Sequence, residues 1–479
     1  MSSERLNMIL VNLASIMENA DGALLPGVYN EVGSALDIGP TGLGSLALCT
    51  SIVQPSCYPL AAYLARRHNR AHVVALGAFL WSAATFLFAF SDTYFQVAVS
   101  RALNGIGLAI ALPAIQSLVA DSTEDNHRGM AFGWLHLTGS IGAILGNLCS
   151  VLLASRSFMG IPGWRVAFHL VGLVSVIVGI LVRLFAYDPR FSSNGDMARD
   201  LAPGMPIWSE VKEVIEEAKS VLRIPSFLVI VAQGVPGSFP MSAFSFAPMW
   251  YELIGFSHGT TAFLVTIFIV ANSLGGLFGG KMGDILSQRF PDSGRIALAQ
   301  ISASSGIPFA AISLGLPSDP SKGFLYGLLL FIFGFCRSWI APATNNPIFA
   351  EIVPKRHRTS IYAMDRMFES VLKSFAPPIV GILAQNVYGY KRPQQQGSTN
   401  STTQTEIIKD PANAKSLAKA LYAATGIPMA LCCLIFTFLH CTYPRDRDAA
   451  RLQARKEEAL EEVHPILNNS EYLGVELQG

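Results

Sequence analysis

A few ionisable side chains lie inside long apolar segments, where a charge costs at least ~2.5–3.5 kcal/mol and normally faces the protein interior or water. Glu18 and Asp21 lie in the first such segment, and Arg101 lies in the fourth. Because Glu18 and Asp21 are three residues apart, they would share one face of a helix, where two carboxylates can share a proton. This spacing predicts a proton- or ion-coupling site. A partnership of either acid with Arg101 would let protonation of the acid release the arginine for an anionic group. The alternatives are a permanent salt bridge and placement of the acids near the end of the helix.

A second group of polar residues is expected to line a substrate cavity. Arg337 lies within the apolar run GFCRSWIAPATNNP, whose prolines and asparagines are expected to interrupt the helix beside a cavity. Gln233 precedes two prolines in QGVPGSFP, which predicts a helix bend next to the same cavity. The predicted cavity residues are Gln233, Arg337, Asn345, Asn346, Glu369 and Lys373.

The eleventh apolar segment carries a polar stripe. Asp365, Glu369 and Lys373 recur every four residues, and the step from Glu369 to Lys373 is a favourable pairing on a helix. Asp365 and Arg366 lie nearest the start of the segment, so we expect them to belong to a gate at the membrane face. For Glu369 and Lys373 the spacing does not decide between lining the cavity and belonging to the gate. Of the residues in this stripe, only Lys373 lies clearly deep in the segment.

The rest of the chain is unusually apolar. Of its 479 residues, 51% are hydrophobic and 14% are charged, whereas a soluble protein carries about 25% charged residues. A soluble chain of this length would form several domains, and each would need a polar surface that this composition does not supply. A soluble multidomain enzyme is therefore excluded.

The apolar residues form blocks of about 20, the length of a helix that crosses a hydrocarbon core about 30 Å thick. We therefore predict an all-α membrane protein with twelve transmembrane helices in two pseudo-symmetric bundles of six. The twelve blocks lie near 8–30, 41–65, 72–91, 95–119, 129–154, 165–187, 225–252, 259–281, 296–316, 323–350, 359–387 and 417–442.

The two halves resemble each other in sequence. Ala-Asp at 120–121 and His-Arg at 127–128 recur 230 positions later as Ala-Glu at 350–351 and His-Arg at 357–358. A repeat of two six-span units indicates a transporter whose site lies between the halves.

The same pattern predicts the domain organisation. We expect an N-terminal half at 1–187, a linker at 188–224, a C-terminal half at 225–442 and a tail at 443–479. In the linker, WSEVKEVIEEAKSVLR predicts an amphipathic helix along the cytoplasmic membrane face. Its expected apolar stripe consists of Val211, Val214, Ile215, Ala218 and Leu222.

The distribution of Lys and Arg among the short loops predicts the orientation. These residues cluster after the second, sixth, eighth, tenth and twelfth spans, all on one side, so that side and both termini are expected to be cytoplasmic. The polar 388–416 loop is an exception; its sequon at Asn400 suits the opposite face. The first block lacks a preceding basic region and is expected to remain as a span. The sequence does not distinguish the plasma membrane from an endomembrane.

Other classes of function have little support in the sequence. The net charge is +1 and the basic residues are dispersed, so we expect no nucleic-acid partner. The seven cysteines have no paired spacing, and we expect no metal and no cofactor. The expected partners are a small-molecule or lipid-like substrate, protons or another coupling ion, and the bilayer, with the protein acting as a monomer.

Loop motifs give the chain a resemblance to the major facilitator superfamily, and within it to the Spinster-like branch and its plant relatives. The superfamily pattern G-x-L-A-D-R-x-G-R follows the second and eighth spans. After the eighth span its outline is matched by Gly280, Gly283, Asp284 and Arg295, and after the second span it is matched by Leu64, Ala65, Arg67 and Arg70, with Arg66 in place of the acid. The resemblance implies a cytoplasmic gate formed by Arg67, Arg70, Asp284 and Arg295.

The fourth span adds to this resemblance. RALNGIGLAIALP fits the family pattern R-x-x-x-G-x-G through Arg101, Gly105 and Gly107, although Leu108 stands where the Spinster branch usually has an acid. The implied function is secondary transport by alternating access of a small organic or amphiphilic solute such as a lysolipid or sphingoid. The alternatives are a transport-inactive membrane scaffold or sensor and a multispan lipid-modifying enzyme; we expect no enzyme activity.

Overall fold

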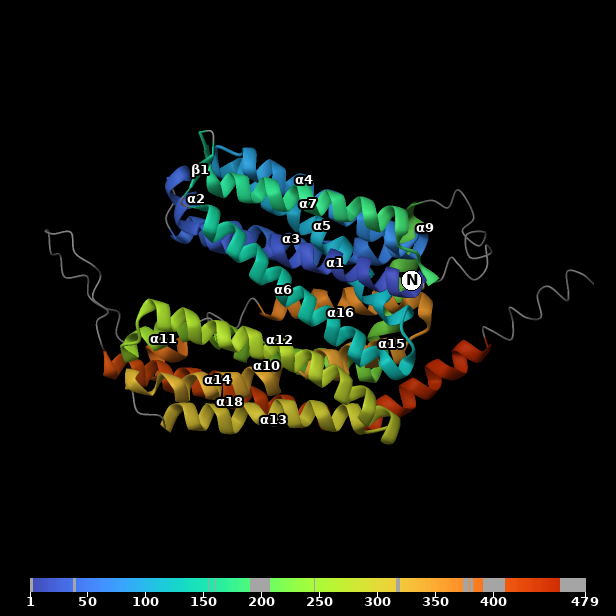
Figure 1. Ribbon diagram of the computed structural model, residues 1–479. Coiled ribbons are helices and arrows are strands. Elements are labelled where there is room, and N and C mark those ends of the chain that lie inside the picture. The colour runs from blue at the N-terminus through green and yellow to red at the C-terminus, as the bar shows by residue number, and fades with distance from the viewer. Residues whose placement is uncertain are drawn as a thin grey trace, which may run out of the picture.

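The computed structural model describes residues 3–37, 40–154, 156–158, 160–189, 207–244, 246–315, 319–373, 379, 382–390 and 410–456. These residues are almost entirely helical, and the helices run side by side in two bundles (Figure 1). The first bundle contains α1 (Ser3–Leu24), η1 (Pro26–Val28), α2 (Tyr29–Leu36), α3 (Pro40–Arg67), α4 (Arg70–Phe90), α5 (Tyr94–Asp121), η2 (Asp125–His127), α6 (Arg128–Ala154), the short hairpin β1 (Ser157–Phe158) and β2 (Ile161–Pro162), and α7 (Gly163–Phe185).

The second bundle follows the linker helix α9 (Ile207–Leu222). It contains α10 (Pro225–Phe244), α11 (Ala247–Ile254), α12 (His258–Arg289), α13 (Gly294–Gly315), η3 (Pro320–Lys322), α14 (Gly323–Arg337), the π-helix η4 (Ala341–Asn345), α15 (Asn346–Glu351), η5 (Lys355–His357), α16 (Arg358–Lys373), η6 (Leu383–Val387) and α18 (Pro411–Thr437). The chain is helical again over 439–456.

Local sequence determines where several helices begin. The side chain of Asn69 caps α4, that of Ser257 caps α12, and that of Asp410 caps α18. Thr93 and Gln96 form a capping box at the start of α5, in which each side-chain oxygen accepts a hydrogen bond from the backbone N–H of the other residue. These caps satisfy backbone N–H groups that have no partner within the helix.

The two ends of the molecule differ in what they contain (Figure 1). The start of α1, the helix α9 and the 439–456 helix lie at one end, which we call the linker end. The hairpin β1–β2, α2 and α11 lie at the other end, which we call the hairpin end. The termini of the described chain thus share one end, as an even number of spans requires. Which face of a membrane the linker end occupies stays a prediction.

The bundles meet through reciprocal helix pairs. The fifth long helix, α6, packs against α12 of the second bundle, and its counterpart α16 packs against α3 of the first. This exchange between corresponding helices is the arrangement expected for two pseudo-symmetric halves.

All twelve expected apolar blocks contain helix within the described residues. In the part of the chain that the structure describes, eight helices are long and apolar enough to cross a membrane, or nine if the pair Ile215–Leu222 and Pro225–Met241, which is bent by 82°, counts as one span. Helices α3, α13 and α16 do not meet this measure of length and hydropathy; α16 has only 16 residues. The predicted domain boundaries stay predictions.

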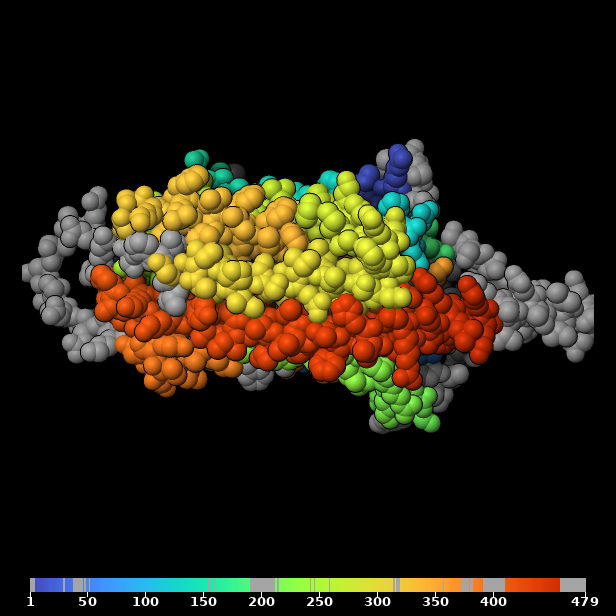
Figure 2. Space-filling model, turned by 90° about the horizontal axis from the view of Figure 1, so that it is seen from below, coloured from blue at the N-terminus to red at the C-terminus, as the bar shows by residue number. Residues whose placement is uncertain are grey.

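Large apolar side chains cover the outside of the bundles. Figure 2 shows the outer face of the second half, where α13, α14 and α18 lie side by side. Exposed side chains on these three helices include Ile301, Ile312, Phe324, Leu328, Leu431 and Leu434. Such a surface suits a hydrocarbon environment and not water.

The linker contains a helix, α9, and the membrane-facing position predicted for its apolar stripe stays a prediction. Glu217 and Val221 are buried, whereas Ile215 and Leu222, from the predicted stripe, are exposed. The side chains of Val211 and Val214 lie outside the described residues. The helix turns a polar face containing Glu217 toward the protein because that face makes ionic contacts, described below.

Candidate substrate and coupling site

Helices of both bundles enclose a cavity of about 330 Å³. Five of the six predicted cavity residues line it, from α10, α14, η4, α15 and α16: Gln233, Arg337, Asn345, Asn346 and Glu369. His136 of α6 and Asn272 of α12 also line the cavity, and their side chains lie 3.1 Å apart across the two halves. The structure therefore brings the predicted residues together where the halves meet.

The expected helix interruption next to Arg337 is confirmed. Helix α14 ends at Arg337 and gives way to the π-helix η4 before α15 begins. A π-helical turn inside a span is common at functional sites. In contrast, α10 remains helical through both prolines that follow Gln233.

Arg337 has an unusual set of contacts. Its Nη2 donates a hydrogen bond to the Gly237 carbonyl oxygen at 3.0 Å, and its buried Nε has no hydrogen-bond partner. Among the described residues no carboxylate lies within ion-pair distance of this guanidinium, although Glu369 is close enough to act on it electrostatically. The arginine therefore retains donors that can bind an anionic group.

Asp365 and Arg366 lie deeper than expected. Because α16 begins at Arg358, Asp365 is about 10 Å along the helix, and both residues line the cavity. Arg366 Nη1 lies 3.0 Å from Glu369 Oε2, and its Nε lies 3.4 Å from Gln116 Oε1 of α5. The side chain of Lys373 lies outside the described residues.

Asp21 is buried inside the first half between α4 and α5. Its carboxylate accepts hydrogen bonds from Asn104 Nδ2 at 2.7 Å and from the Thr85 hydroxyl. Arg101, which is also buried, acts on it electrostatically. The predicted association of Asp21 with Arg101 therefore has a structural counterpart, although polar groups of α4 and α5 make its direct hydrogen bonds.

Glu18 has different surroundings. It accepts a hydrogen bond at 2.6 Å from Asn19 Nδ2 and is within electrostatic range of Arg366 in the second half. The two acids thus lie on one helix, with Asp21 held in the first half and Glu18 oriented toward the interface between the halves.

The second-half gate residues form a compact network at the linker end. Asp284, at the end of α12, accepts hydrogen bonds from the backbone N–H groups of Gly129 and Met130 at 2.8 and 2.7 Å. These groups belong to the first turn of α6, so the carboxylate caps a helix of the other half and interacts with its dipole. Arg295 lies 3.1 Å from Asp284 and 3.5 Å from Glu351.

The first-half gate residues separate into two groups. Arg70 is fully buried and pairs with Asp121 at 2.6 Å and with Asp188 at 2.5 Å. Asp121 also pairs with Arg358 of the second half, which closes a link between the bundles. Arg67 instead lies over the ring of Tyr63, with its guanidinium carbon 5.6 Å from the ring centre.

Close backbone contact accompanies these polar links. A Cβ atom added to Gly280 of α12 would collide with the carbonyl oxygen of Gly129 in α6. Helices α5 and α16 also meet across the two halves, where the buried hydroxyls of Ser117 and Thr359 lie 2.8 Å apart. The linker end is therefore closed by contacts between the halves.

Sequence reasoning missed several of these partners. Thr85, Asn104 and Asn272 are short polar residues in apolar helices and carry no distinguishing local pattern. Asp121 and Arg358 did have a signal, since both belong to the internal repeat. Asn400 of the predicted sequon lies outside the described residues.

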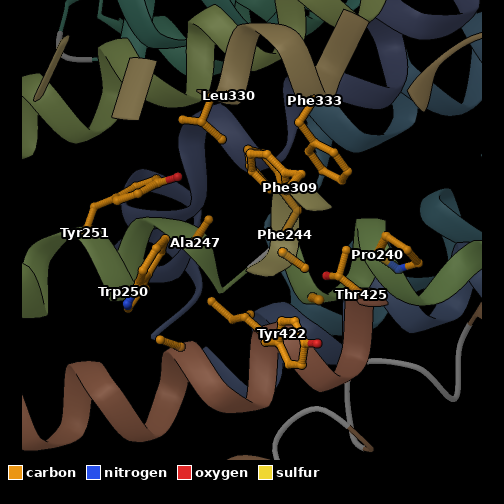
Figure 3. A pocket seen from close by; sticks show the side chains of 14 residues that line it. Pro240, Phe244, Ala247, Trp250, Tyr251, Phe309, Leu330, Phe333, Tyr422 and Thr425 are labelled. Carbon is orange, nitrogen blue, oxygen red and sulfur yellow. The ribbon is translucent and has the colours of Figure 1, made fainter. Parts of the chain in front are cut away.

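The second half contains a separate apolar pocket at the hairpin end (Figure 3). It has a volume of about 50 Å³, and aromatic side chains including Phe244, Trp250, Phe309 and Phe333 surround it. Helix α10 contributes to both spaces, because Gly237 and Met241 line the cavity while Pro240 and Phe244 line the pocket.

Two helical bundles with an apolar exterior, a polar cavity between them and ionic contacts that join them at one end define a polytopic membrane transport fold. Residues 10–377 match the Major Facilitator Superfamily, and the chain belongs to this family. Protein spinster of Drosophila melanogaster is 24% identical over 412 residues, which are 82% of this chain and 64% of that protein. The predicted resemblance to the Spinster branch is thereby confirmed. The quinolone resistance protein NorA of Staphylococcus aureus is 24% identical over 160 residues, which are 33% of this chain and 40% of that protein.

Solved structures show the same fold. The proton:xylose symporter XylE bound to 6-bromo-6-deoxy-D-glucose aligns with a TM-score of 0.63 at 16% identity, covering 90% of this chain and 95% of that one. A bacterial homologue of the human lysosomal transporter Spinster, in an inward-facing and unoccupied conformation, aligns with a TM-score of 0.58 at 16% identity, covering 93% and 99%.

Proposed function

We propose that the protein is a secondary active transporter that works by alternating access and uses protons to move an amphiphilic organic solute with an anionic head group. The observation that carries this proposal is Arg337, a cation in the cavity whose one hydrogen bond to a described residue is to a backbone carbonyl. A guanidinium in this position favours a carboxylate or phosphate, which it can bind through two parallel hydrogen bonds.

The neighbouring apolar pocket supports an amphiphilic substrate over a sugar-like one. Along α10 the polar cavity and the aromatic pocket follow each other within two turns, from Gly237 to Phe244. A head group at Arg337 would place the start of an apolar chain beside Met241, and the chain would extend toward the pocket. A lysolipid or a sphingoid phosphate has this combination of groups.

Asp21 supports a proton as the coupling ion. Thr85 has one hydroxyl proton but faces two acceptors, the Trp81 carbonyl at 2.8 Å and the Asp21 carboxylate. A neutral Asp21 donates to Thr85 and leaves the threonine proton for Trp81, whereas an ionised Asp21 is favoured by Asn104 and Arg101. Both protonation states therefore have partners, as a site that cycles between them requires. The structural relative XylE is itself a proton symporter.

The proposal is tested with purified protein in liposomes under an imposed pH gradient. The probes are a lysophosphatidate, which is anionic, and sphingosine, which is cationic, together with any metabolite that differs between cells lacking and overexpressing the protein. We expect gradient-driven movement of the anionic amphiphile, and we expect Glu18→Gln and Asp21→Asn to reduce the gradient dependence. Asp92→Asn is the matched control, because Asp92 is an exposed acid at the hairpin end.

Arg337 has its own test in the same assay. Arg337→Gln is expected to raise KM roughly tenfold or more, the effect of losing a charge-assisted hydrogen bond, while Arg337→Lys retains part of the affinity. Equal gradient-driven uptake by wild type, Glu18→Gln and Asp21→Asn would show that neither acid couples transport to the proton gradient. A wild type that moves none of the probes or identified metabolites would favour a scaffold or sensor.

A further inference from the structure

The two pseudo-symmetric gates carry opposite charges at one position. After the eighth span, Gly280 and Asp284 match the superfamily pattern, and in the corresponding segment after the second span Ala62 and Arg66 stand 218 positions earlier. Asp284 caps the first turn of α6 through Gly129 and Met130. Arg66 has the opposite charge and cannot serve as the equivalent cap.

The helix that lacks this cap is α16. Arg128 at the start of α6 donates from Nε to the Ala120 carbonyl at 3.0 Å, and Arg358 at the start of α16 donates from Nε to the Ala350 carbonyl at 3.1 Å. Because the same contact recurs 230 positions later, each residue at the start of α6 corresponds to the residue 230 positions further along, at the start of α16. The residues of α16 that correspond to Gly129 and Met130 are therefore Thr359 and Ser360.

A carboxylate does occupy the start of α16, and it comes from the linker helix. Glu217 Oε1 accepts a hydrogen bond from the Ser360 hydroxyl at 2.8 Å and lies 2.6 Å from His357 Nδ1. Its other oxygen, Oε2, lies 3.8 Å from Arg66 Nη1. The side chain of Glu217 is only 4% exposed, whereas that of its neighbour Glu216 is 62% exposed.

We propose that Glu217 of α9 replaces the gate acid missing at Arg66, so that the linker helix is a working part of the gate at the linker end. The carboxylate binds two side chains at the start of α16, where Asp284 binds two backbone N–H groups at the start of α6, and Arg66 attaches it to the first half. Opening of the linker end then requires Glu217 to leave Arg66 or the pair His357 and Ser360. The linker thereby controls a conformational step, which rests on the alternating access proposed above.

The experiment measures amide hydrogen exchange of the purified full-length protein in detergent and needs no substrate. Two segments are followed, residues 207–222 of α9 and residues 361–366 of α16. The variants are Glu217→Gln, the double variant Arg66→Asp with Glu217→Gln, and Glu216→Gln as the matched control. Thermal unfolding of each variant verifies that the protein is folded.

We expect Glu217→Gln to speed exchange in both segments by roughly tenfold, the effect of losing a charge-assisted hydrogen bond, and Glu216→Gln to leave both unchanged. The double variant restores an acid on α3, so exchange of 361–366 should return to within about twofold of wild type while 207–222 stays fast. Unchanged exchange of 361–366 in Glu217→Gln, or no recovery in the double variant, would overturn the proposal. Because no transport is measured, a failure of the proposed function would appear only in the liposome assay.

Discussion

Asp284 is the central residue of the gate proposed in the second half, because it satisfies three buried donors at once. It receives two backbone N–H groups of α6 and the guanidinium of Arg295, and both ionic side chains are nearly inaccessible to water. A buried ion pair of this kind contributes little more to stability than two apolar side chains would. Removing one partner, however, leaves the other charge buried and uncompensated.

Asp284→Ala is therefore expected to lower the free energy of unfolding by roughly 3–5 kcal/mol. The measurement is thermal unfolding in detergent. Asp292→Ala is the control, since Asp292 forms a surface pair with Arg447 and its side chain is 66% exposed. We expect a change below about 1 kcal/mol for that control. Equal melting temperatures for the two variants would contradict the role given to Asp284.

Glu217 makes the linker contact sensitive to pH. Burial opposes its ionisation, but His357, Ser360 and Arg66 favour the carboxylate more strongly, so its pKa lies below the ordinary value of 4.5. A depressed pKa means that the contact contributes stability above pH 4.5, and that this contribution is lost as the pH falls through the pKa of the folded state.

The gap in melting temperature between wild type and Glu217→Gln should therefore narrow as the pH falls from about 5 to about 3. Unfolding curves recorded across this range provide the measurement, with Glu216→Gln again as the control. A gap that widens on acidification would have the wrong sign for a carboxylate held by cations.

At the scale of elements, the crossing of α6 and α12 shows how closely the halves approach. Gly280 lies against the Gly129 backbone, so that any side chain would push the helices apart. Small residues at such crossings let backbones pack tightly in membranes.

Gly280→Ala is expected to destabilise the protein by about 1–3 kcal/mol through this overlap. The control is Gly259→Ala in the same helix, where an added Cβ meets nothing within 4 Å. There the alanine removes backbone entropy from the unfolded chain and should leave the melting temperature unchanged or slightly raised. A Gly280→Ala protein as stable as the control would show that the crossing relaxes without cost.

The elements themselves were largely predictable from sequence, because hydropathy and proline act locally. The apolar blocks, the break after Arg337 and the linker helix all depend on residues that are neighbours in the chain. The face that α9 buries was not predictable, since it is determined by His357 and Ser360, about 140 residues away. The cap of α6 by Asp284 joins residues 154 and 155 positions apart and carries no local pattern.

At the scale of the whole molecule, the polar links between halves concentrate at the linker end. Asp284, Glu217, Asp121 and Arg358 all lie there, as does the contact between Ser117 and Thr359. The cavity lies between the same helices, farther toward the hairpin end. This distribution is expected for one state of a transporter whose two ends open in turn, and the opposite state requires every one of these contacts to separate.

That requirement predicts the effect of a reversible cross-link. Ser117 and Thr359 have hydroxyl oxygens 2.8 Å apart on α5 and α16, close enough for a disulfide between cysteines placed there. In the double variant Ser117→Cys with Thr359→Cys, oxidation should hold the linker end closed and reduce gradient-driven uptake to the level of protein-free liposomes. Reduction should restore uptake, because it removes only the link. The single variant Ser117→Cys, oxidised in the same way, controls for the seven native cysteines, and mass spectrometry verifies the new bond. If the fully cross-linked protein carried substrate at the wild-type rate, the linker end would not be a gate, and transport would have to follow a path that leaves this closure intact.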